Sequence, residues 1–371
     1  MAIHQIENIE QLEKLTGKKI PKNQREKISE ILETMPVRLT DLLLKSAKKS
    51  EKVASQFLPN ISELKKSGCE KPWVGIMRTG IQGLERMYVD RCIILPFNQC
   101  PAYCRFCFRK FYEKKKAMPM TYENIDKALA YIKKDERLKG VLITGGDPLL
   151  DLKRLEYILK NLRKIKHVQD IRIGTRSPMY APERITDNLV KMLKRYHNVE
   201  KMRPIEIATH FNHPDEITPQ AIKAITKITK SSIRMYNQTV LLKGINDNPQ
   251  VLADLFRKLR LLGVEIYCLY HCDPVKGIDH FRTSIQKGLE IKKYLRRETG
   301  RINPTYLVDT QIGKVEIGVD GYIEKKEGKH VWIKTPYKLS TYKSVCQNFK
   351  LPEGQCKVDK YGYISIKYLD G

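Results

Sequence analysis

PFNQCPAYCRFCFRK, residues 96–110, contains three cysteines within eight positions. Cys100, Cys104 and Cys107 have the spacing C-x3-C-x2-C. A zinc site is normally completed by a fourth Cys or His, and none occurs in the twenty residues after Cys107. Three thiolates instead suit a 4Fe–4S cluster in which one iron is left for a non-protein ligand. The stretch therefore predicts an iron–sulfur site, and the competing interpretation is that the cysteines are only small apolar side chains.

The cysteines follow the first of six apolar segments that we expect to be strands. These segments are RCIIL (91–95), GVLIT (140–144), DIRIGT (170–175), IEIAT (205–209), MYNQTVLL (235–242) and VEIYCLY (264–270). Amphipathic helical patterns separate them, at 122–134, 153–165, 186–196, 218–230 and 250–262, and another follows at 284–298. Thr121 and Thr218 are expected helix N-caps. This alternation predicts an α/β fold with a parallel sheet and right-handed crossovers, either doubly wound or a barrel.

The flanking regions differ from this core. Residues 1–80 are polar with helical periodicity and predict an N-terminal helical extension, and residues 81–302 form the core. The last region, 303–371, begins with the segment that contains Lys314. Residues 315–371 then show short alternating runs with Gly and Pro between them, which predict a small C-terminal β region.

The composition limits the class of protein. The chain has 371 residues, 41% of them hydrophobic, and no apolar run approaches the roughly 18 residues of a membrane span. The start is acidic and amphipathic, unlike a signal peptide, so we expect a cytoplasmic protein without a membrane partner. The net charge of +27 fits a nucleic-acid partner, an anionic partner or a lysine-rich surface. Because the basic runs are short and mixed with acids, a scattered basic surface is favoured and nucleic acid is not expected.

The cysteine spacing, with Phe106 before Cys107, resembles the signature of radical S-adenosylmethionine (SAM) enzymes. The resemblance implies that SAM binds the open iron and that its one-electron reduction yields a 5′-deoxyadenosyl radical. It also implies a partial (β/α)6 TIM-like barrel, which six strands match. Thr144, Gly145, Gly146 and Asp147 follow the second strand and are similar to the GGE-type motif that binds the amino group of SAM in this superfamily.

Further segments resemble the lysine 2,3-aminomutase family, in family order between about residues 80 and 314. They include YVDRCIIL, CRFCFRK, LITGGDPLL, IRIGTRSP, ATHFNHPDEIT, NQTVLLKGIND, YCLYHCDPVKGIDHFRT and PTYLVDT. The resemblance implies an isomerase that uses the cluster, SAM and pyridoxal 5′-phosphate (PLP). It would convert L-lysine to β-lysine by hydrogen abstraction and 1,2-amino migration. It further implies a small-molecule amino acid substrate, a flavodoxin- or ferredoxin-type reductant and a homo-oligomer.

Three residues match the family's substrate-binding positions. Arg109 falls where relatives grip the substrate α-carboxylate, a group that a guanidinium can bind through two hydrogen bonds. Asp273 and Asp309 fall where lysine-specific members place two aspartates around the side-chain ammonium. A buried cation needs compensating carboxylates, so both together favour a cationic substrate. Taken singly, each could instead be a turn-capping aspartate or, for Arg109, a surface arginine.

Other residues match cofactor positions. His210 and Gln238 fall near SAM, Tyr88 and Arg91 beside PLP, and Lys314 is the first lysine after Asp309 and the expected PLP-binding lysine. Two departures stand out. Met87 stands where the relatives have an arginine, so one phosphate contact is either lost or taken over by Arg86. The segment before Lys314 is two residues shorter than in relatives and has one glycine, so an ordinary exposed lysine remains the alternative there.

Two other functions remain open from the sequence. One keeps the aminomutase chemistry with arginine, another amino acid or a protein-bound lysine as substrate. The other is a PLP-free radical SAM enzyme that modifies RNA, a function suggested by the net charge.

Overall fold

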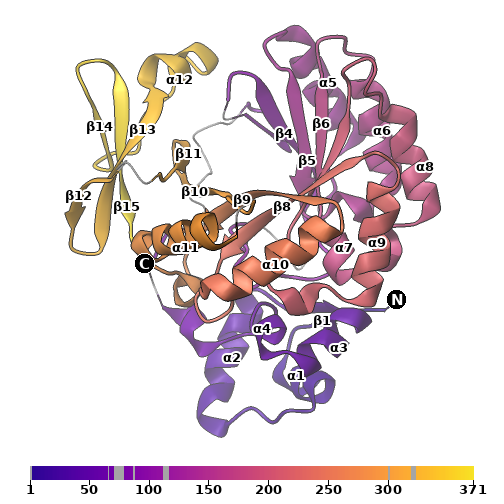
Figure 1. Ribbon diagram of the computed structural model, residues 1–371, viewed down its shortest axis with the longest axis vertical. Helices are drawn as coiled ribbons and strands as arrows, with labels where there is room; N and C mark the ends of the chain where they lie inside the picture. The colour runs from indigo at the N-terminus through magenta and orange to yellow at the C-terminus, as the bar shows by residue number, and fades with distance from the viewer. Residues whose placement is uncertain are drawn as a thin grey trace.

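A nine-stranded sheet organises the computed structural model, which describes residues 2–65, 67–70, 79–86, 88–111, 117–299, 301–318 and 323–371. Its strands are β3 (Leu84–Glu85), β4 (Arg91–Phe97), β5 (Gly140–Gly145), β6 (Asp170–Gly174), β7 (Ile205–Thr209), β8 (Arg234–Leu241), β9 (Val264–His271), β10 (Thr305–Thr310) and β11 (Gly313–Glu316). The sheet runs in sequence order from β3 to β11. Strands β4 to β10 are parallel, whereas β3 and β11 pair antiparallel at the two edges. Because the edge strands lie at opposite ends of the order, the curled sheet is an open half-barrel (Figure 1).

Helices connect the consecutive parallel strands and cover the outer face of the sheet (Figure 1). They are α5 (Tyr122–Lys134), α6 (Leu152–Leu162), α8 (Asp187–Tyr196), α9 (Pro219–Thr229), α10 (Pro249–Leu261) and α11 (Ile285–Glu298), with the short α7 (Ser177–Tyr180) before α8. The predicted caps are confirmed, because the side chains of Thr121 and Thr218 accept hydrogen bonds from the backbone of the first turns of α5 and α9. The six predicted strands and the partial (β/α)6 barrel are likewise confirmed.

The strand pattern separates an apolar outer layer from a more polar inner face. In β6, Ile171 and Ile173 are fully buried, while Arg172 between them is half-buried. Strand β5 repeats this with buried Val141 and Ile143. Because successive side chains of a strand point to opposite faces, the apolar residues pack under the helices and the remaining positions face the barrel interior. The interior is therefore the place for polar chemistry.

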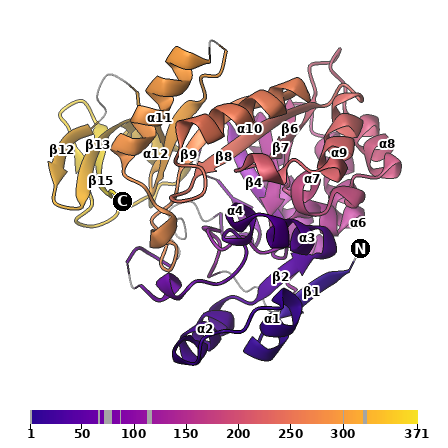
Figure 2. The ribbon, with the colours of Figure 1, turned by 60° about the horizontal axis from the view of Figure 1, so that its bottom comes forward.

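The N-terminal region packs below the half-barrel (Figure 2). It contains β1 (Ile3–Ile6), α1 (Ile9–Thr16), α2 (Lys22–Thr34), β2 (Val37–Thr40), α3 (Asp41–Lys49) and α4 (Glu51–Ala54). The prediction of a purely helical extension is incomplete, because β1 and β2 form a two-stranded antiparallel sheet. The two strands begin 34 residues apart, at Ile3 and Val37, and their register pairs Ile3 with Thr40 and Ile6 with Val37. Local periodicity does not reveal a pairing between segments so far apart.

The C-terminal region contains a four-stranded antiparallel sheet, which confirms the predicted β region. It consists of β12 (Ile323–Glu327), β13 (His330–Lys338), β14 (Cys356–Val358) and β15 (Tyr363–Leu369), with α12 (Leu339–Val345) between β13 and β14. Strands β10 and β11 belong instead to the main sheet, since β10 pairs in parallel with β9. The predicted boundary after residue 302 therefore separates two strands from the sheet that holds them. Within the described ranges, no helix has the length and apolar character needed to cross a membrane.

Candidate functional site

The loop with the three cysteines leaves the carboxyl end of β4 and is fixed from two sides. Backbone N–H groups of Gly146 and Asp147, after β5, donate to the carbonyls of Phe97 and Gln99 at 2.7 and 2.8 Å. On the other side, the backbone N–H of Arg105 donates to the carbonyl of Gln56, just after α4, at 2.7 Å. The N-terminal region therefore positions the cysteine loop, as does the adjacent strand.

The donor set suits a cluster better than a single ion. Cys100, Cys104 and Cys107 are all partly buried. In the part of the chain that the structure describes, no three His, Cys, Asp or Glu side chains converge closely enough to hold one metal ion. One zinc ion with sulfurs at about 2.3 Å would need them within about 4 Å of each other. Three thiols that are spaced apart on one loop fit a 4Fe–4S cluster with an open iron.

The two glycines at the carboxyl end of β5, Gly145 and Gly146, are required by the cysteine loop itself. A Cβ on Gly146 would lie 2.2 Å from the carbonyl oxygen of Gln99, and Gly145 has a φ of +111°. No other residue could occupy Gly146 without moving the loop, and Gly145 adopts a conformation that favours glycine. The turn formed by Thr144, Gly145 and Gly146 thus lies directly against the loop that carries Cys100.

The Asp147 carboxylate is occupied by donors of the chain itself. It accepts hydrogen bonds from the Thr175 hydroxyl (2.7 Å), the Ser177 hydroxyl (2.9 Å), the Tyr180 hydroxyl (2.8 Å) and two backbone N–H groups. Five donors fill the roughly four lone-pair positions of a carboxylate. This geometry does not favour the expected contact between the Asp147 side chain and the amino group of SAM. The carboxylate instead ties the glycine turn to the segment after β6.

His210 directly follows β7, and Gln238 lies within β8. Both are on the same side of the sheet as the cysteine loop. The ring of His210 contacts that of Phe106 edge-on, with centroids 5.7 Å apart. Burial lowers the pKa of His210 well below its usual value, so the ring is neutral. Its Nε2 atom is buried and has no partner among the described residues. An orphaned buried nitrogen beside the cysteine loop fits a contact with a bound ligand.

Lys314 lies in the hairpin of β10 and β11, directly opposite Asp309. Its Nζ donates to the Tyr270 hydroxyl at 2.9 Å and lies 4.9 Å from the centroid of that ring. The same hydroxyl accepts from Nε2 of Gln238 at 3.4 Å. Tyr270 therefore links the expected PLP lysine to the expected SAM-side glutamine. Burial is the strongest single influence on Lys314 and opposes its charge, but Asp309, Tyr88 and Cys268 together outweigh it, and the lysine pKa is raised.

Tyr88 and Arg91 are next to this hairpin. The Tyr88 hydroxyl accepts a hydrogen bond from the backbone N–H of Lys314 at 3.1 Å. The half-exposed guanidinium of Arg91 lies 4.3 Å from the centroid of the Tyr88 ring. A positive charge beside Lys314 is the arrangement a phosphate group needs.

Arg86 does not take the place of the arginine that Met87 replaces. Its buried guanidinium donates to the Asp135 carboxylate at 2.7 Å, the Tyr131 hydroxyl at 3.2 Å and the carbonyls of Tyr88 and Val89. These contacts leave it facing α5 rather than the Lys314 hairpin, so the expectation that it contacts a phosphate is not supported. Met87 itself lies outside the described residues.

The structure brings the two aspartates close enough to interact. Burial raises the pKa of Asp273 well above its usual value, and the charge of Asp309 raises it further. Burial also raises the pKa of Asp309, against the opposing charges of Lys314 and then Arg109. Two neighbouring buried carboxylates repel each other and favour a cation between or beside them. Asp273, Asp309, Lys314 and Arg109 therefore surround one region of the barrel interior.

Arg109 has a carboxylate partner that the sequence reasoning missed. Its Nη2 donates to Oε2 of Glu85 in β3 at 3.1 Å, and its guanidinium lies 4.8 Å from the centroid of the Phe108 ring. Glu85 stands three residues before Tyr88, so its nearness to a matched position was the available signal. Tyr270 was missed as well, although it lies near the carboxyl end of β9, three residues before Asp273.

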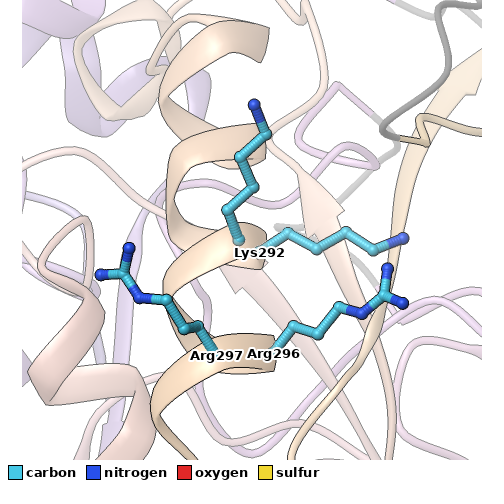
Figure 3. Close-up of a pocket in the computed structure, with 4 residues that line it drawn as sticks. Lys292, Arg296 and Arg297 are labelled. Atoms are coloured by element: carbon cyan, nitrogen blue, oxygen red, sulfur yellow. The ribbon is translucent and has the colours of Figure 1, made fainter.

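A hollow of about 350 Å³ lies elsewhere, along α11 (Figure 3). It is lined by Lys292, Lys293, Arg296 and Arg297, all of them cationic. None of the residues predicted for the cluster, SAM, PLP or the substrate lines it, so it is separate from the candidate site.

Comparisons with known proteins agree with the sequence patterns. Residues 94–256 match the family model described as the Radical SAM superfamily. The L-lysine 2,3-aminomutase of Clostridium subterminale is 36% identical over 317 residues, 84% of this chain and 74% of that one. The L-lysine 2,3-aminomutase of Methanococcus maripaludis is 46% identical over 239 residues, 64% of this chain and 54% of that one. The glutamate 2,3-aminomutase of Clostridioides difficile is 41% identical over 236 residues, covering 62% and 54%.

Proposed function

Because this chain belongs to the lysine 2,3-aminomutase family of radical SAM enzymes, as its sequence predicts, we propose that it isomerises L-lysine to β-lysine. The amino group moves from C2 to C3 while one hydrogen atom moves from C3 to C2, so the atoms balance without a further reactant. The observation that carries the choice of substrate is the buried pair of carboxylates, Asp273 and Asp309. A substrate with a distal ammonium neutralises this pair, whereas a distal carboxylate, as in glutamate, would be repelled by it.

The proposed cofactor sites follow from the same geometry. We assign Cys100, Cys104 and Cys107 to the 4Fe–4S cluster, and the Thr144–Gly146 turn with His210 and Gln238 to SAM. Lys314, with Tyr88 and Arg91, would hold PLP by its aldehyde and phosphate. When bound, SAM and the cluster supply a 5′-deoxyadenosyl radical, and PLP carries the migrating amino group. One electron must reach the cluster, and a flavodoxin- or ferredoxin-type protein is the proposed donor.

The chain's own residues then bind and orient the substrate. Arg109 holds the α-carboxylate while the aspartates hold the side-chain ammonium, which fixes both ends of a free lysine. The Tyr270 hydroxyl accepts a hydrogen bond from Lys314 Nζ and thereby orients this amino group. Residues of the C-terminal β region cover the hairpin: the hydroxyls of Tyr337 and Tyr342 donate to the carbonyls of Lys314 and Ile312. This cover excludes water from a site in which radicals must survive.

Asparagine at either aspartate tests the substrate assignment. We expect Asp273→Asn and Asp309→Asn each to raise the KM for L-lysine by about two orders of magnitude, because truncating one member of a buried charge pair costs about 2–5 kcal/mol. Steady-state kinetics of the reconstituted enzyme measure it. Asp279→Asn is the matched control, since Asp279 lies in the same loop and pairs only loosely with Arg282 at 3.7 Å. An unchanged KM for lysine in both variants would refute the ammonium-binding role.

The pH dependence provides an independent check. With raised pKa values, the pair retains protons at a pH where an isolated aspartate, of pKa about 4, has lost them. Lysine binds the deprotonated pair, so kcat/KM should fall as pH decreases through these raised values. In Asp309→Asn the neighbouring charge is gone, so the remaining fall should move to lower pH. A fall that stays in place or moves to higher pH in this variant would contradict the coupling of the two carboxylates.

A further inference from the structure

Arg176, at the carboxyl end of β6, reaches one of the cysteine sulfurs. It is 6% exposed, and its Nη1 donates to Sγ of Cys104 at 2.8 Å. Its Nε donates to the carbonyl of His210 at 2.9 Å, and its Nη2 to Oε1 of Gln56 at 2.8 Å. One guanidinium thus joins the middle cysteine, the SAM-side histidine and the N-terminal region.

A buried carboxylate holds this guanidinium in place. Oε1 of Glu216 accepts from Nη2 of Arg176 at 3.1 Å and from Nε2 of Gln56 at 2.5 Å, and its Oε2 accepts from the backbone N–H of Asn212 at 2.9 Å. Glu216 is 1% exposed. The rings of Phe57 and Phe106 flank the guanidinium, with centroids 5.0 and 5.4 Å from its Cζ atom. Packed and hydrogen-bonded on every side, Arg176 keeps one orientation toward Cys104.

A cation at a cysteine ligand affects the redox equilibrium of an iron–sulfur cluster. Reduction adds one electron, and its charge spreads onto the ligand sulfurs, so an N–H donor carrying positive charge stabilises the reduced state. The effect is large where water is excluded, because the surroundings screen the charges weakly. The negative charge of Glu216, on the far side of the guanidinium, acts in the opposite direction.

We propose that Arg176 is a positioning residue that raises the reduction potential of the cluster through its hydrogen bond to Cys104, with Glu216 limiting that increase. The inference rests on the proposed assignment of Cys104 as a cluster ligand. The two charges make predictions of opposite sign, which a general loss of structure would not produce.

The test is a redox titration of the reconstituted protein, followed by the electron paramagnetic resonance signal of the reduced cluster. Arg176→Gln should decrease the ratio of reduced to oxidised cluster about tenfold at a fixed ambient potential, which is a shift of about 59 mV to lower potential. Arg176→Lys, which keeps the charge but cannot reach all four partners, should shift in the same direction by less. Glu216→Gln should shift the potential upward.

Arg203→Gln is the matched control. Its guanidinium also binds several groups, the carbonyls of Val168, Arg163 and Ile165, but it contacts no cysteine, so the potential should stay at the wild-type value. If Arg176→Gln fails to retain iron, the upward shift in Glu216→Gln decides the matter. The role of Arg176 would be overturned by unchanged potentials, or by shifts of the same sign in Arg176→Gln and Glu216→Gln. If iron content and turnover stay at the wild-type level, the cluster assignment and the proposed function would still stand. A wild-type protein that assembles no cluster would overturn the ligand assignment as well.

Discussion

Replacing Cys104 with alanine is expected to abolish cluster assembly and to lower turnover by more than about three orders of magnitude, equivalent to over about 4 kcal/mol of transition-state stabilisation. Three protein ligands are proposed for the cluster, so this change leaves only Cys100 and Cys107 to hold it. Cys104 is also the ligand that Arg176 contacts. Iron and sulfide content, the visible absorption of the cluster and turnover with SAM and a reductant measure the effect.

Cys346→Ala is the control for this change. Cys346 ends α12 in the C-terminal region, is partly buried like Cys104, and takes no part in the cysteine loop. It should retain four irons per chain and wild-type turnover. A Cys104→Ala protein that still binds four irons and turns over would show that the cluster assignment is wrong.

Lys314→Ala is expected to eliminate covalent PLP binding and to reduce turnover by a comparable factor. No other lysine among the described residues donates to Tyr270 or lies opposite Asp309. Borohydride reduction of the protein with PLP, followed by peptide mapping, should place the label on Lys314 in the wild type and on no lysine in the variant. Lys314→Arg should behave in the same way, because a guanidinium keeps the charge but does not bond to the aldehyde.

Lys334→Ala provides the matched control, since Lys334 lies in β13 and pairs at 3.6 Å with Asp359 on the C-terminal sheet. It should leave labelling and turnover unchanged. A label on another lysine in the wild-type protein would show that Lys314 is not the PLP-binding lysine. No label at all, with turnover retained, would favour the PLP-free alternative.

The strands and helices of the main sheet could be predicted from local sequence patterns. The six predicted strands and the helices between them appear within a few residues of their predicted limits, because buried apolar runs and capped amphipathic helices carry their own signals. The errors concern pairing over distance. The β1–β2 sheet joins two short segments that helices separate. Strands β10 and β11 were assigned to the C-terminal region, and only the parallel pairing of β10 with β9 and the antiparallel pairing of β11 with β10 place them in the main sheet.

The candidate site divides in a similar way. Sequence matching proposed the cysteines, the aspartates, Arg109 and Lys314 as site residues, and the last four interact electrostatically in the structure. Sequence matching did not reveal which of the matched polar groups already have hydrogen-bond partners within the chain. The Asp147 carboxylate accepts hydrogen bonds from Thr175, Ser177 and Tyr180. The Arg86 guanidinium donates to the Asp135 carboxylate. Contacts of Arg176 with Cys104 and of Glu85 with Arg109 likewise join residues far apart in sequence, so they require the fold.

Tracing the nitrogen of the substrate tests the proposed 2,3-aminomutase activity. Reconstituted protein would be incubated without oxygen with dithionite, SAM, PLP and L-lysine labelled with 15N at the α-amino group, alongside L-glutamate and L-arginine. We expect 15N to appear on C3 of β-lysine, SAM to be required, and glutamate and arginine to remain unchanged. Label that stays on C2 of lysine while glutamate or arginine is isomerised would contradict the lysine assignment. No migration in any amino acid would contradict the aminomutase activity itself.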